Sequence, residues 1–432
     1  MLATRRWFGA QMDTVVTGRN EERLGLTRRD FGKATLAASA AAVVLTRAPA
    51  FAQDTVLKVG VLLPRSGYLA QPGQACQRGA DIAATLLPEL GFRVEVLNAD
   101  TESNPDVARS RAEKLIQDGA QVIVGAFDSG QTTAAAQVCE QRGIPLVVNI
   151  AAAPQLTEQG YRTIFRNFPT SPTLVGNGLA LMKDLFATTG TTPRSAVFLH
   201  ANDTFGQANK AALDKLFPTL DMPFPMPEAI SYDPKAQDLA VEVAKARATG
   251  AELVIVTTRA NDAIMIVREM VKQRYEPMAV VSPGSPGMYD EQFYKVLGKY
   301  SDYCISNLPW YDPKSPLARK VEKTFKDKFP SDRFEGYAFN VGFTFEAVLI
   351  AADAFKRAGT GEPAALLDAL RQTNLSEKIM LGGPIQFDAK GQNNAIASAC
   401  VQNFKLRPTV VLPKENAEAA PVFPMPGWQK RA

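Results

Sequence analysis

The chain has 432 residues, of which 48 are Lys or Arg, 44 are Asp or Glu and one is His, giving a formal net charge of +4. Eight of the basic and four of the acidic residues lie in the first 52 positions, so the remaining 380 residues carry 40 of each sign. This balance argues against a nucleic-acid partner or an anionic membrane surface. A single histidine, His200, counts against hydrolytic triads and histidine-rich metal sites.

The N-terminal segment has the features of an export signal. Its apolar run, 34–45, has about twelve residues and is too short for a membrane-spanning helix, which needs roughly 20. Ala50 and Ala52 form the small-x-small pattern that a signal peptidase accepts, so we expect cleavage after Ala52. The preceding residues resemble a twin-arginine export signal, with Gly32 in place of a usual leucine: Arg28, Arg29, Phe31 and Lys33. A basic arm on a cytosolic protein is the alternative interpretation.

Beyond residue 52, short apolar runs alternate with helical stretches. We expect strands over 57–63, 93–100, 121–126 and 144–150, with helices between them over 74–90, 105–119 and 133–143. The rhythm restarts with strands over 195–200, 252–258 and 278–284 and helices over 206–217, 237–250 and 261–273. Such alternation predicts parallel sheets covered on both faces, and two runs predict two lobes. Ligands of such folds bind at the carboxyl ends of the strands.

Several motifs of enzymes and metal sites are missing from the sequence. No loop has the glycine spacing of a dinucleotide- or phosphate-binding motif, and neither H-E-x-x-H nor G-x-S-x-G surrounds His200. We therefore expect no enzymatic activity and no cofactor, and His200 is interpreted as a structural residue at a strand end. The cysteines are too widely spaced for a zinc or iron–sulfur site, which leaves a Cys304–Cys400 disulfide or four buried free thiols: Cys76, Cys139, Cys304 and Cys400.

Two further segments have simple structural interpretations. No apolar run after residue 52 reaches the length of a membrane span. The aromatic stretch 334–348 places Phe339, Phe343 and Val348 at helical spacing, which is more typical of a core helix than of a stacking surface.

Five segments of the chain carry motifs in a fixed order. The first, LKVGVLLPRSGYLAQPGQACQRGADIA, has a strand, a P-x-S-G loop and a helix with R-G. The second, DGAQVIVGAFDSGQTTAAAQVCEQRGIPLVVNIAAAPQLT, has a serine loop between two strands. The others are FLHANDTFGQANKAALDK, NLPWYDPKSPLARKVEKTFKDKFP and GPIQFDAKG. Together they resemble the leucine/isoleucine/valine-type (type I) periplasmic binding proteins, the substrate-binding components of ABC importers, over residues 55–405.

This resemblance implies an α/β fold with two doubly wound parallel-sheet lobes, joined by a hinge that closes on a small ligand. It also implies a periplasmic location, with ABC permease subunits at the inner membrane and the twin-arginine translocase as partners. The expected organisation is a signal peptide over 1–52, an N-terminal lobe over 53–168 and 308–395, a C-terminal lobe over 169–307 and 396–412, and a Pro-rich tail over 413–432.

The resemblance also implies which loops hold the ligand. Ser129 matches the family serine that binds a ligand carboxylate through its hydroxyl and backbone N–H. Ala152 stands where the family usually has Thr, so only its backbone can contribute. Phe205 stands where Tyr is usual and can pack on an apolar ligand. The expected ligand-binding residues are Ser66, Tyr68, Ser129, Ala151, Ala152, Phe205, Arg259 and Ser285.

Two departures from the family pattern bear on the ligand. Amino-acid binders of the family place an acidic residue where this chain has 283–286, Pro-Gly-Ser-Pro, and an unpaired ammonium in a closed cleft costs several kcal/mol. Arg259 ends a strand, and its guanidinium can bind a carboxylate. Both departures favour a carboxylate or an amide over an amino acid. Two alternatives remain: Arg259 forms a salt bridge with Asp262 or Asp128, or Asp128 itself meets a ligand ammonium.

These features predict the periplasmic ligand-binding component of an ABC importer. Its ligand is expected to be a small molecule, an amino acid or, preferably, a carboxylate or an amide. A ligand-sensing receptor or regulator of the same fold is the alternative. A twin-arginine-exported cofactor enzyme is a third class, which the missing motifs disfavour.

Overall fold

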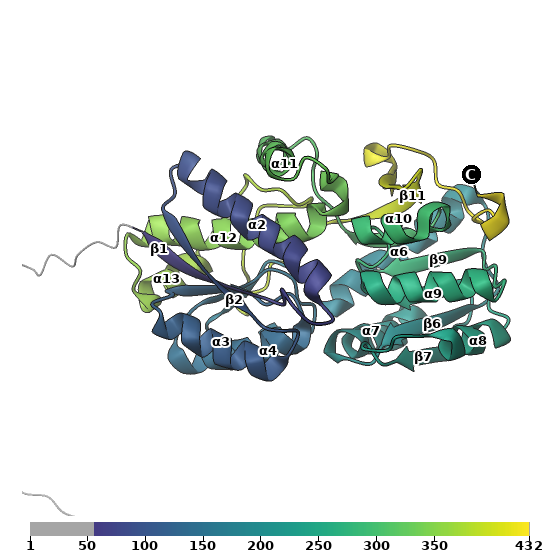
Figure 1. Cartoon of the computed structure of the whole chain (residues 1–432), viewed down its shortest axis with the longest axis horizontal. Helices are drawn as coiled ribbons and strands as arrows, with labels where there is room; N and C mark the ends of the chain where they lie inside the picture. Colours follow the sequence, from purple (N-terminus) through teal and green to yellow (C-terminus); the bar gives the residue numbers. More distant parts are fainter. Residues whose placement is uncertain (1–55, 432) are drawn as a thin grey trace, which may run out of the picture. The chain divides into compact units, whose positions relative to one another are not determined.

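The computed structural model describes residues 56–431. The expected signal peptide and its cleavage site lie outside these residues. The described chain contains two β-sheets, one of five strands and one of seven, each flanked by helices (Figure 1). The predicted α/β fold with parallel-sheet lobes is thereby confirmed.

The five-stranded sheet is parallel throughout and has the order β2-β1-β3-β4-β5. Its central strands are buried on both faces, which explains their almost unbroken apolar sequences. Helices α3 and α4 cover one face, and α2 and α12 cover the other (Figure 1). The strands are β1 (Leu57–Leu63), β2 (Val94–Asp100), β3 (Val122–Gly125), β4 (Leu146–Val148) and β5 (Ile164–Arg166). The helices are α2 (Ala70–Glu89), α3 (Pro105–Gln117), α4 (Ser129–Arg142), α5 (Gln155–Glu158), α11 (Pro316–Lys328), α12 (Ala338–Ala358) and α13 (Pro363–Arg371), with the 3-10 turn η2 (Phe334–Gly336).

The seven-stranded sheet has the order β12-β11-β10-β9-β8-β6-β7. Helices α6 and α7 pack on one face and α8, α9 and α10 on the other. Its strands are β6 (Ala196–Ala201), β7 (Glu228–Tyr232), β8 (Leu253–Thr257), β9 (Ala279–Pro283), β10 (Ile305–Pro309), β11 (Ser398–Phe404) and β12 (Arg407–Leu412). Its helices are α6 (Ser171–Thr189), α7 (Thr204–Thr219), α8 (Ala240–Ala248), α9 (Ala260–Lys272) and α10 (Glu291–Leu297), with the 3-10 turns η1 (Gly298–Ser301), η3 (Lys414–Asn416) and η4 (Trp428–Lys430).

The last two strands of this sheet run antiparallel to their neighbours. A two-residue loop, Lys405 and Leu406, joins β11 to β12, and both residues have positive φ (51° and 61°). Positive φ at both positions suits a tight hairpin turn, and strands joined by so short a loop must be antiparallel. The hairpin therefore modifies the expected all-parallel sheet at its edge.

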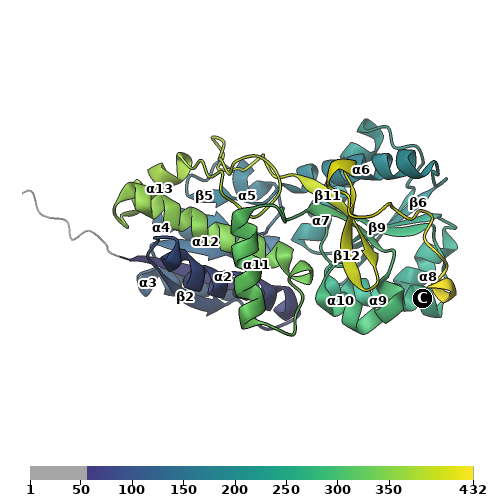
Figure 2. The ribbon, with the colours of Figure 1, turned by 90° about the horizontal axis from the view of Figure 1, so that it is seen from above.

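The chain passes between the two sheets three times, at 167–170, 310–315 and 393–397. Figure 2 shows the third passage leading from the loops beside α13 into β11. The expected lobe boundaries, which fall at 168, 307 and 395, remain predictions.

Helix α12 is the central helix of the N-terminal core. It packs against α2, and Phe339, Phe343 and Val348 are almost fully buried, which confirms the core interpretation of 334–348. By length and composition it is the one described helix apolar enough to cross a membrane, but 94% of that apolar stretch is buried inside the protein. Its hydrophobicity is thus accounted for by packing.

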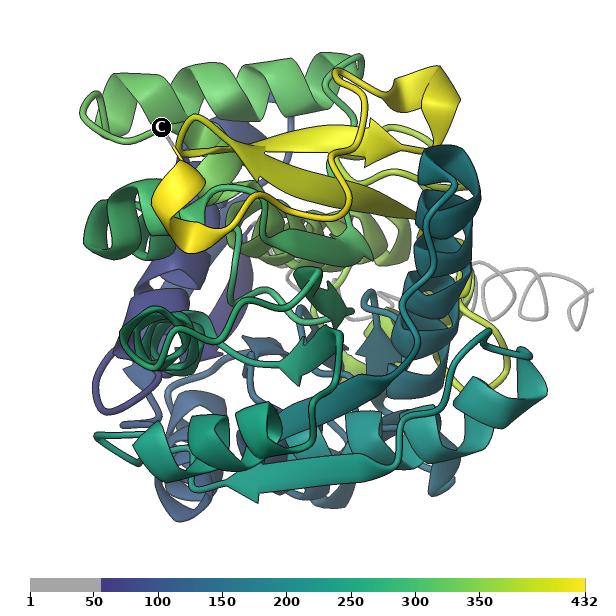
Figure 3. The same ribbon diagram turned by 90° about the vertical axis from the view of Figure 1, so that its right-hand side faces the viewer.

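The segment after β12 packs closely on the seven-stranded lobe (Figure 3, yellow). Trp428 is 1% exposed and donates its indole N–H to the carbonyl of Tyr275 at 2.6 Å. Arg431 lies over the indole at 3.9 Å and donates to the carbonyls of Tyr300 and Asp302. The four cysteines are buried and unpaired, so the structure has the free-thiol alternative: Cys76, Cys139, Cys304 and Cys400.

Candidate functional site

The candidate site lies where loops that follow strands of both sheets meet. β3 and β4 end side by side in one sheet, and β6, β8 and β9 end side by side in the other. Their loops, with Phe168 and Phe339, enclose a narrow cavity that as it stands has room for about one water molecule. Its mostly apolar lining with a few polar groups is typical of a small-molecule site, and a ligand would enter it only if the surrounding loops moved apart. It is lined by Phe127, Asp128, Ser129, Ile150, Ala151, Ala152, Phe168, Phe205, Arg259, Gly284, Pro286 and Phe339.

The first turn of α4 positions Ser129. The helix begins at Ser129, four residues earlier than expected, because Asp128 caps it. Oδ1 of Asp128 accepts hydrogen bonds from the backbone N–H groups of Gly130 (3.0 Å) and Gln131 (3.3 Å). The Ser129 hydroxyl accepts a hydrogen bond from the N–H of Ala153 at 3.3 Å, which ties this turn to the loop after β4.

Several backbone N–H groups of residues that line the cavity lack an acceptor within the described part of the chain, among them those of Ser129, Ile150, Ala151 and Ala152. Within 56–431, neither the N–H of Ser129 nor that of Ala152 donates a hydrogen bond. Both residues are only 1% exposed. Because buried backbone N–H groups are almost always paired, these groups are available to an oxygen atom of a ligand.

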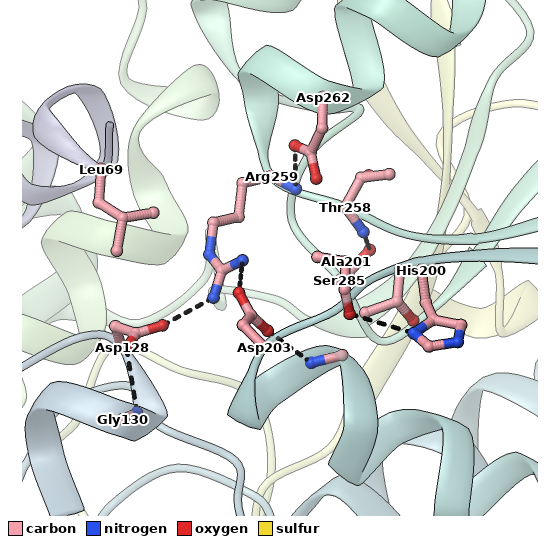
Figure 4. A network of polar contacts seen from close by, with 12 residues as sticks. Leu69, Asp128, Gly130, His200, Ala201, Asp203, Thr258, Arg259, Asp262 and Ser285 are labelled. Carbon is pink, nitrogen blue, oxygen red and sulfur yellow. Dashed lines mark hydrogen bonds and ion pairs between the residues drawn. The ribbon is translucent and has the colours of Figure 1, made fainter. Parts of the chain in front are cut away.

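The Arg259 side chain joins loops of the two sheets (Figure 4). Its Nη2 donates to Oδ2 of Asp128 and its Nη1 to Oδ2 of Asp203, each at 2.7 Å. The guanidinium carbon lies 5.2 Å from the centre of the Phe205 ring. Asp203 also caps α7 by accepting from the N–H of Gly206 at 2.8 Å. The guanidinium is thus already shared between two carboxylates.

Burial and charge pairing have opposite effects on the pKa values of Asp128, Asp203 and Arg259. Burial raises the pKa of Asp128, and Arg259 offsets the rise only in part. Burial alone would also raise the pKa of Asp203, but Arg259 and the N–H of Gly206 outweigh it and the pKa lies below its usual value. Burial alone would lower the pKa of Arg259, but Asp203 and Asp128 outweigh it, so the pKa is raised. Arg259 is therefore charged at all ordinary pH values.

Asp262 supports the backbone of Arg259 and leaves the guanidinium to other partners. Its Oδ1 accepts the backbone N–H of Arg259 at 2.7 Å, and its Oδ2 accepts the Tyr232 hydroxyl at 2.6 Å. Burial raises the pKa of Asp262 to about 6, although the Tyr232 hydroxyl and Arg259 oppose the rise. Of the two salt bridges considered from the sequence, the one with Asp128 forms and the one with Asp262 does not, among the described residues.

Three of the expected ligand-binding residues do not line this cavity. The backbone N–H of Ser66 donates to Asp100 at 3.3 Å, and Ser66 lies in the loop before α2. Tyr68 lines a neighbouring pocket of about 400 Å³, and its pKa is raised to about 12 by burial and by Asp128. The Ser285 hydroxyl is fully buried and accepts the N–H of Thr258 at 2.9 Å. The cavity brings together the other five: Ser129, Ala151, Ala152, Phe205 and Arg259.

The structure adds lining residues that sequence reasoning did not assign to the site. Phe168 and Phe339 are in edge contact at 5.5 Å and form an apolar wall, although Phe339 was expected only in the core. Asp203 lies within a motif that resembles the family, but its bond to Arg259 has no local sequence signal. His200 has the structural role predicted for it, since it is 2% exposed and its Nδ1–H donates to the carbonyl of Ala201 at 3.0 Å. Within 56–431, no three His, Cys, Asp or Glu side chains are grouped to hold a metal ion.

Comparisons with known proteins agree with this architecture. The family described as "Periplasmic binding protein" matches residues 56–407. Leu/Ile/Val-binding protein homolog 1 of Brucella abortus (strain 2308) is 25% identical over 341 residues, which cover 77% of this chain and 86% of the relative. The leucine-, isoleucine-, valine-, threonine-, and alanine-binding protein of Pseudomonas aeruginosa is 22% identical over 346 residues, covering 79% and 87%.

Solved structures share the fold. The branched-chain amino acid transporter substrate binding protein LivJ of Streptococcus pneumoniae, in complex with isoleucine, aligns with a TM-score of 0.70 at 18% identity and covers 85% of this chain and 99% of its own. An ABC-transporter solute binding protein of R. palustris, in complex with benzoate, aligns with a TM-score of 0.69 at 19% identity, covering 84% and 98%. With the family match extending over most of its length, the chain belongs to the periplasmic binding protein family.

Proposed function

We propose that this protein is the ligand-binding component of an ABC importer and takes up a small molecule that has an apolar body and a carboxylate or amide head. The observation that carries the proposal is the pair of unpaired, buried N–H groups of Ser129 and Ala152 beside an apolar cavity. The hydrogen bond from the N–H of Ala153 to the Ser129 hydroxyl holds the two loops together, and N–H donors from two such loops can share one carbonyl or carboxylate oxygen.

The walls of the cavity account for the apolar body. Phe127, Phe168, Phe205 and Phe339 all line it, and Ile150 adds a further apolar surface. Aromatic walls bind flat or branched apolar groups through burial and offset contacts. The known binders of branched-chain amino acids and of benzoate with this fold show that it accommodates both kinds of body.

An amino acid is the competing ligand, and Asp128 is the observation that favours it. Its Oδ2 accepts one hydrogen bond, from Arg259, and a carboxylate oxygen accepts two or more. A ligand ammonium beside Ser129 could take the remaining position. Leucine therefore belongs in any binding panel.

The biological setting follows from the family and the export signal. We propose cleavage near Ala52, export by the twin-arginine translocase, residence in the periplasm and delivery of the ligand to permease subunits at the inner membrane. A role as a ligand-sensing receptor would use the same cavity, and binding experiments alone do not separate the two roles. Transport of the ligand by cells with and without the gene does.

The binding proposal is tested by thermal unfolding of the purified protein with leucine, isobutyramide, isobutyrate, benzamide, benzoate and succinate. A ligand at 100 times its dissociation constant adds about 2.7 kcal/mol to the stability and raises the midpoint. Ser129→Ala should weaken binding about fivefold by removing one hydroxyl, whereas Ser110→Ala on the exposed face of α3 should leave it unchanged. If no compound in the panel raises the midpoint, the proposed head-group chemistry is wrong.

A further inference from the structure

The N-terminus of α4 is already occupied by a carboxylate of the protein. A helix N-terminus attracts negative charge through its free N–H groups. Here Oδ1 of Asp128 accepts from the N–H groups of Gly130 and Gln131, at 3.0 and 3.3 Å. Of the first-turn donors nearest the cavity, the N–H of Ser129 remains for a ligand.

The charges at the cavity sum to a net negative value. Among the residues that the structure describes, Arg259 is the one cation that lines it, and two carboxylates, Asp128 and Asp203, hold its Nη2 and Nη1. All three side chains are largely buried, with exposed fractions of 9%, 8% and 15% for Arg259, Asp128 and Asp203. Asp128 is adjacent to Ser129 in the chain and lines the same cavity. A second anion at Ser129 would meet this carboxylate with no free cation to balance it.

A neutral carboxamide fits the same donors and acceptors. Its carbonyl oxygen can accept from the N–H groups of Ser129 and Ala152. Its NH₂ group can donate to Oδ2 of Asp128, which accepts one hydrogen bond from Arg259. The carboxylate of the same body has no N–H to offer and adds a like charge.

We propose that Asp128 is a specificity-determining residue that makes the cavity select an uncharged carboxamide over the carboxylate of the same body. This inference rests on the proposed function and names its substrate class. The apolar walls set the body of the ligand, while Asp128 and the free N–H groups set its head.

The test is isothermal calorimetry at pH 7.5 with leucine and two matched pairs, benzamide against benzoate and isobutyramide against isobutyrate. The wild-type protein should bind at least one amide ten or more times more tightly than its carboxylate. Asp128→Asn keeps a side chain able to cap α4 but removes the charge, so the preference for the amide should shrink tenfold or reverse. Asp81→Asn, on the exposed side of α2, is the matched control and should leave the ratio unchanged.

The outcomes separate the two proposals. Tighter binding of a carboxylate by the wild type, or an Asp128→Asn variant with an unchanged ratio, overturns the role of Asp128 and leaves the proposed function standing. Tightest binding of leucine also overturns it, because the head is then a zwitterion. If the Asp128→Asn variant fails to fold, as judged by its circular dichroism, the proposal is decided by the wild type alone, from the ratio of its dissociation constants for the carboxylate and the amide. Binding of no compound overturns the proposed function and this inference together.

Discussion

Replacing Asp290 by Asn should stabilise the protein at neutral pH. Asp290 precedes α10, in the seven-stranded lobe, and meets Gln71 of α2. The Gln71 Nε2 donates to both oxygens of Asp290 at 2.7 Å, while the Gln71 Oε1 is buried without a hydrogen-bond partner. A buried carboxylate beside an unsatisfied oxygen is unfavourable, and an amide offers the missing donor.

The magnitude follows from the pKa of Asp290. Burial raises it from 3.8 to about 6, although the bonds from Gln71 and from the N–H of Gln292 oppose the rise, and the charges of Glu291 and Lys295 act in opposite directions. Such a shift means that folding favours the protonated over the ionised carboxyl group by about 3 kcal/mol, since one pKa unit is about 1.4 kcal/mol. The pKa of Asp290 is higher in the folded than in the unfolded protein, so the protonated carboxyl group stabilises the fold. This contribution is fully present below the unfolded pKa near 4 and is lost as the pH rises through the folded pKa of about 6.

Asp290→Asn removes this loss, since Asn keeps an acceptor for Gln292 and can donate to the Oε1 of Gln71. The variant should exceed the wild type by about 1–3 kcal/mol at pH 7.5 and by less than about 1 kcal/mol at pH 4. Urea unfolding followed by circular dichroism measures both differences, with the exposed Asp81→Asn as control. A variant less stable than the wild type at pH 7.5, or a difference independent of pH, would refute the reasoning.

Three further substitutions test the close packing of α7, the C-terminal segment and the charge pairing of Arg259. A Cβ on Gly206 would lie 1.8 Å from the carbonyl oxygen of Ala201, so Gly206→Ala should lower the unfolding free energy by about 3 kcal/mol and weaken ligand binding. Gly176→Ala is the control, because the nearest atom to its added Cβ is 3.7 Å away, and it should not destabilise the protein. Trp428→Ala should lower the free energy of unfolding in urea by about 3–5 kcal/mol. A decrease below about 1 kcal/mol would show that the C-terminal segment does not stabilise the lobe. Arg259→Ala leaves two buried carboxylates unpaired and should lower the unfolding free energy by about 3–5 kcal/mol at pH 7.5. The loss should shrink as the pH falls, because burial without the guanidinium raises the pKa of both carboxyl groups; a loss independent of pH contradicts this.

The sequence predicted the strands closely because they are buried on both faces. The expected strand 57–63 coincides with β1, and the strand expected over 252–258 differs from β8 by one residue at each end. The starts of helices were less predictable. α2 and α4 each begin four residues before the expected position, because their first turns contain Gln, Gly, Pro and Ser, which carry no apolar periodicity. Many elements had no counterpart among the expected ones, including α5, β5, α6, β7, α10, α11, α13 and β12.

The site was predictable in position and less so in its connections. Parallel strands bring their carboxyl ends together, so Ser129 could be placed near Ala152 from the neighbouring strands β3 and β4, and Arg259 near Asp203 from the neighbouring strands β8 and β6. The ion pair between Arg259 and Asp128 joins residues 131 positions apart, and the Arg259–Asp203 pair joins the loops after β8 and β6. The pair between Arg259 and Asp128 depends on how the two sheets pack, which has no local sequence signal.

The central claim is that the free N–H groups of Ser129 and Ala152 hold the head of the ligand. A crystal structure with the tightest-binding compound of the panel tests it most directly. The account predicts an oxygen of the ligand about 3 Å from both nitrogen atoms, with the apolar body against Phe168 and Phe339. A ligand located instead in the neighbouring pocket beside Tyr68, or one that leaves both N–H groups unpaired, would contradict the account.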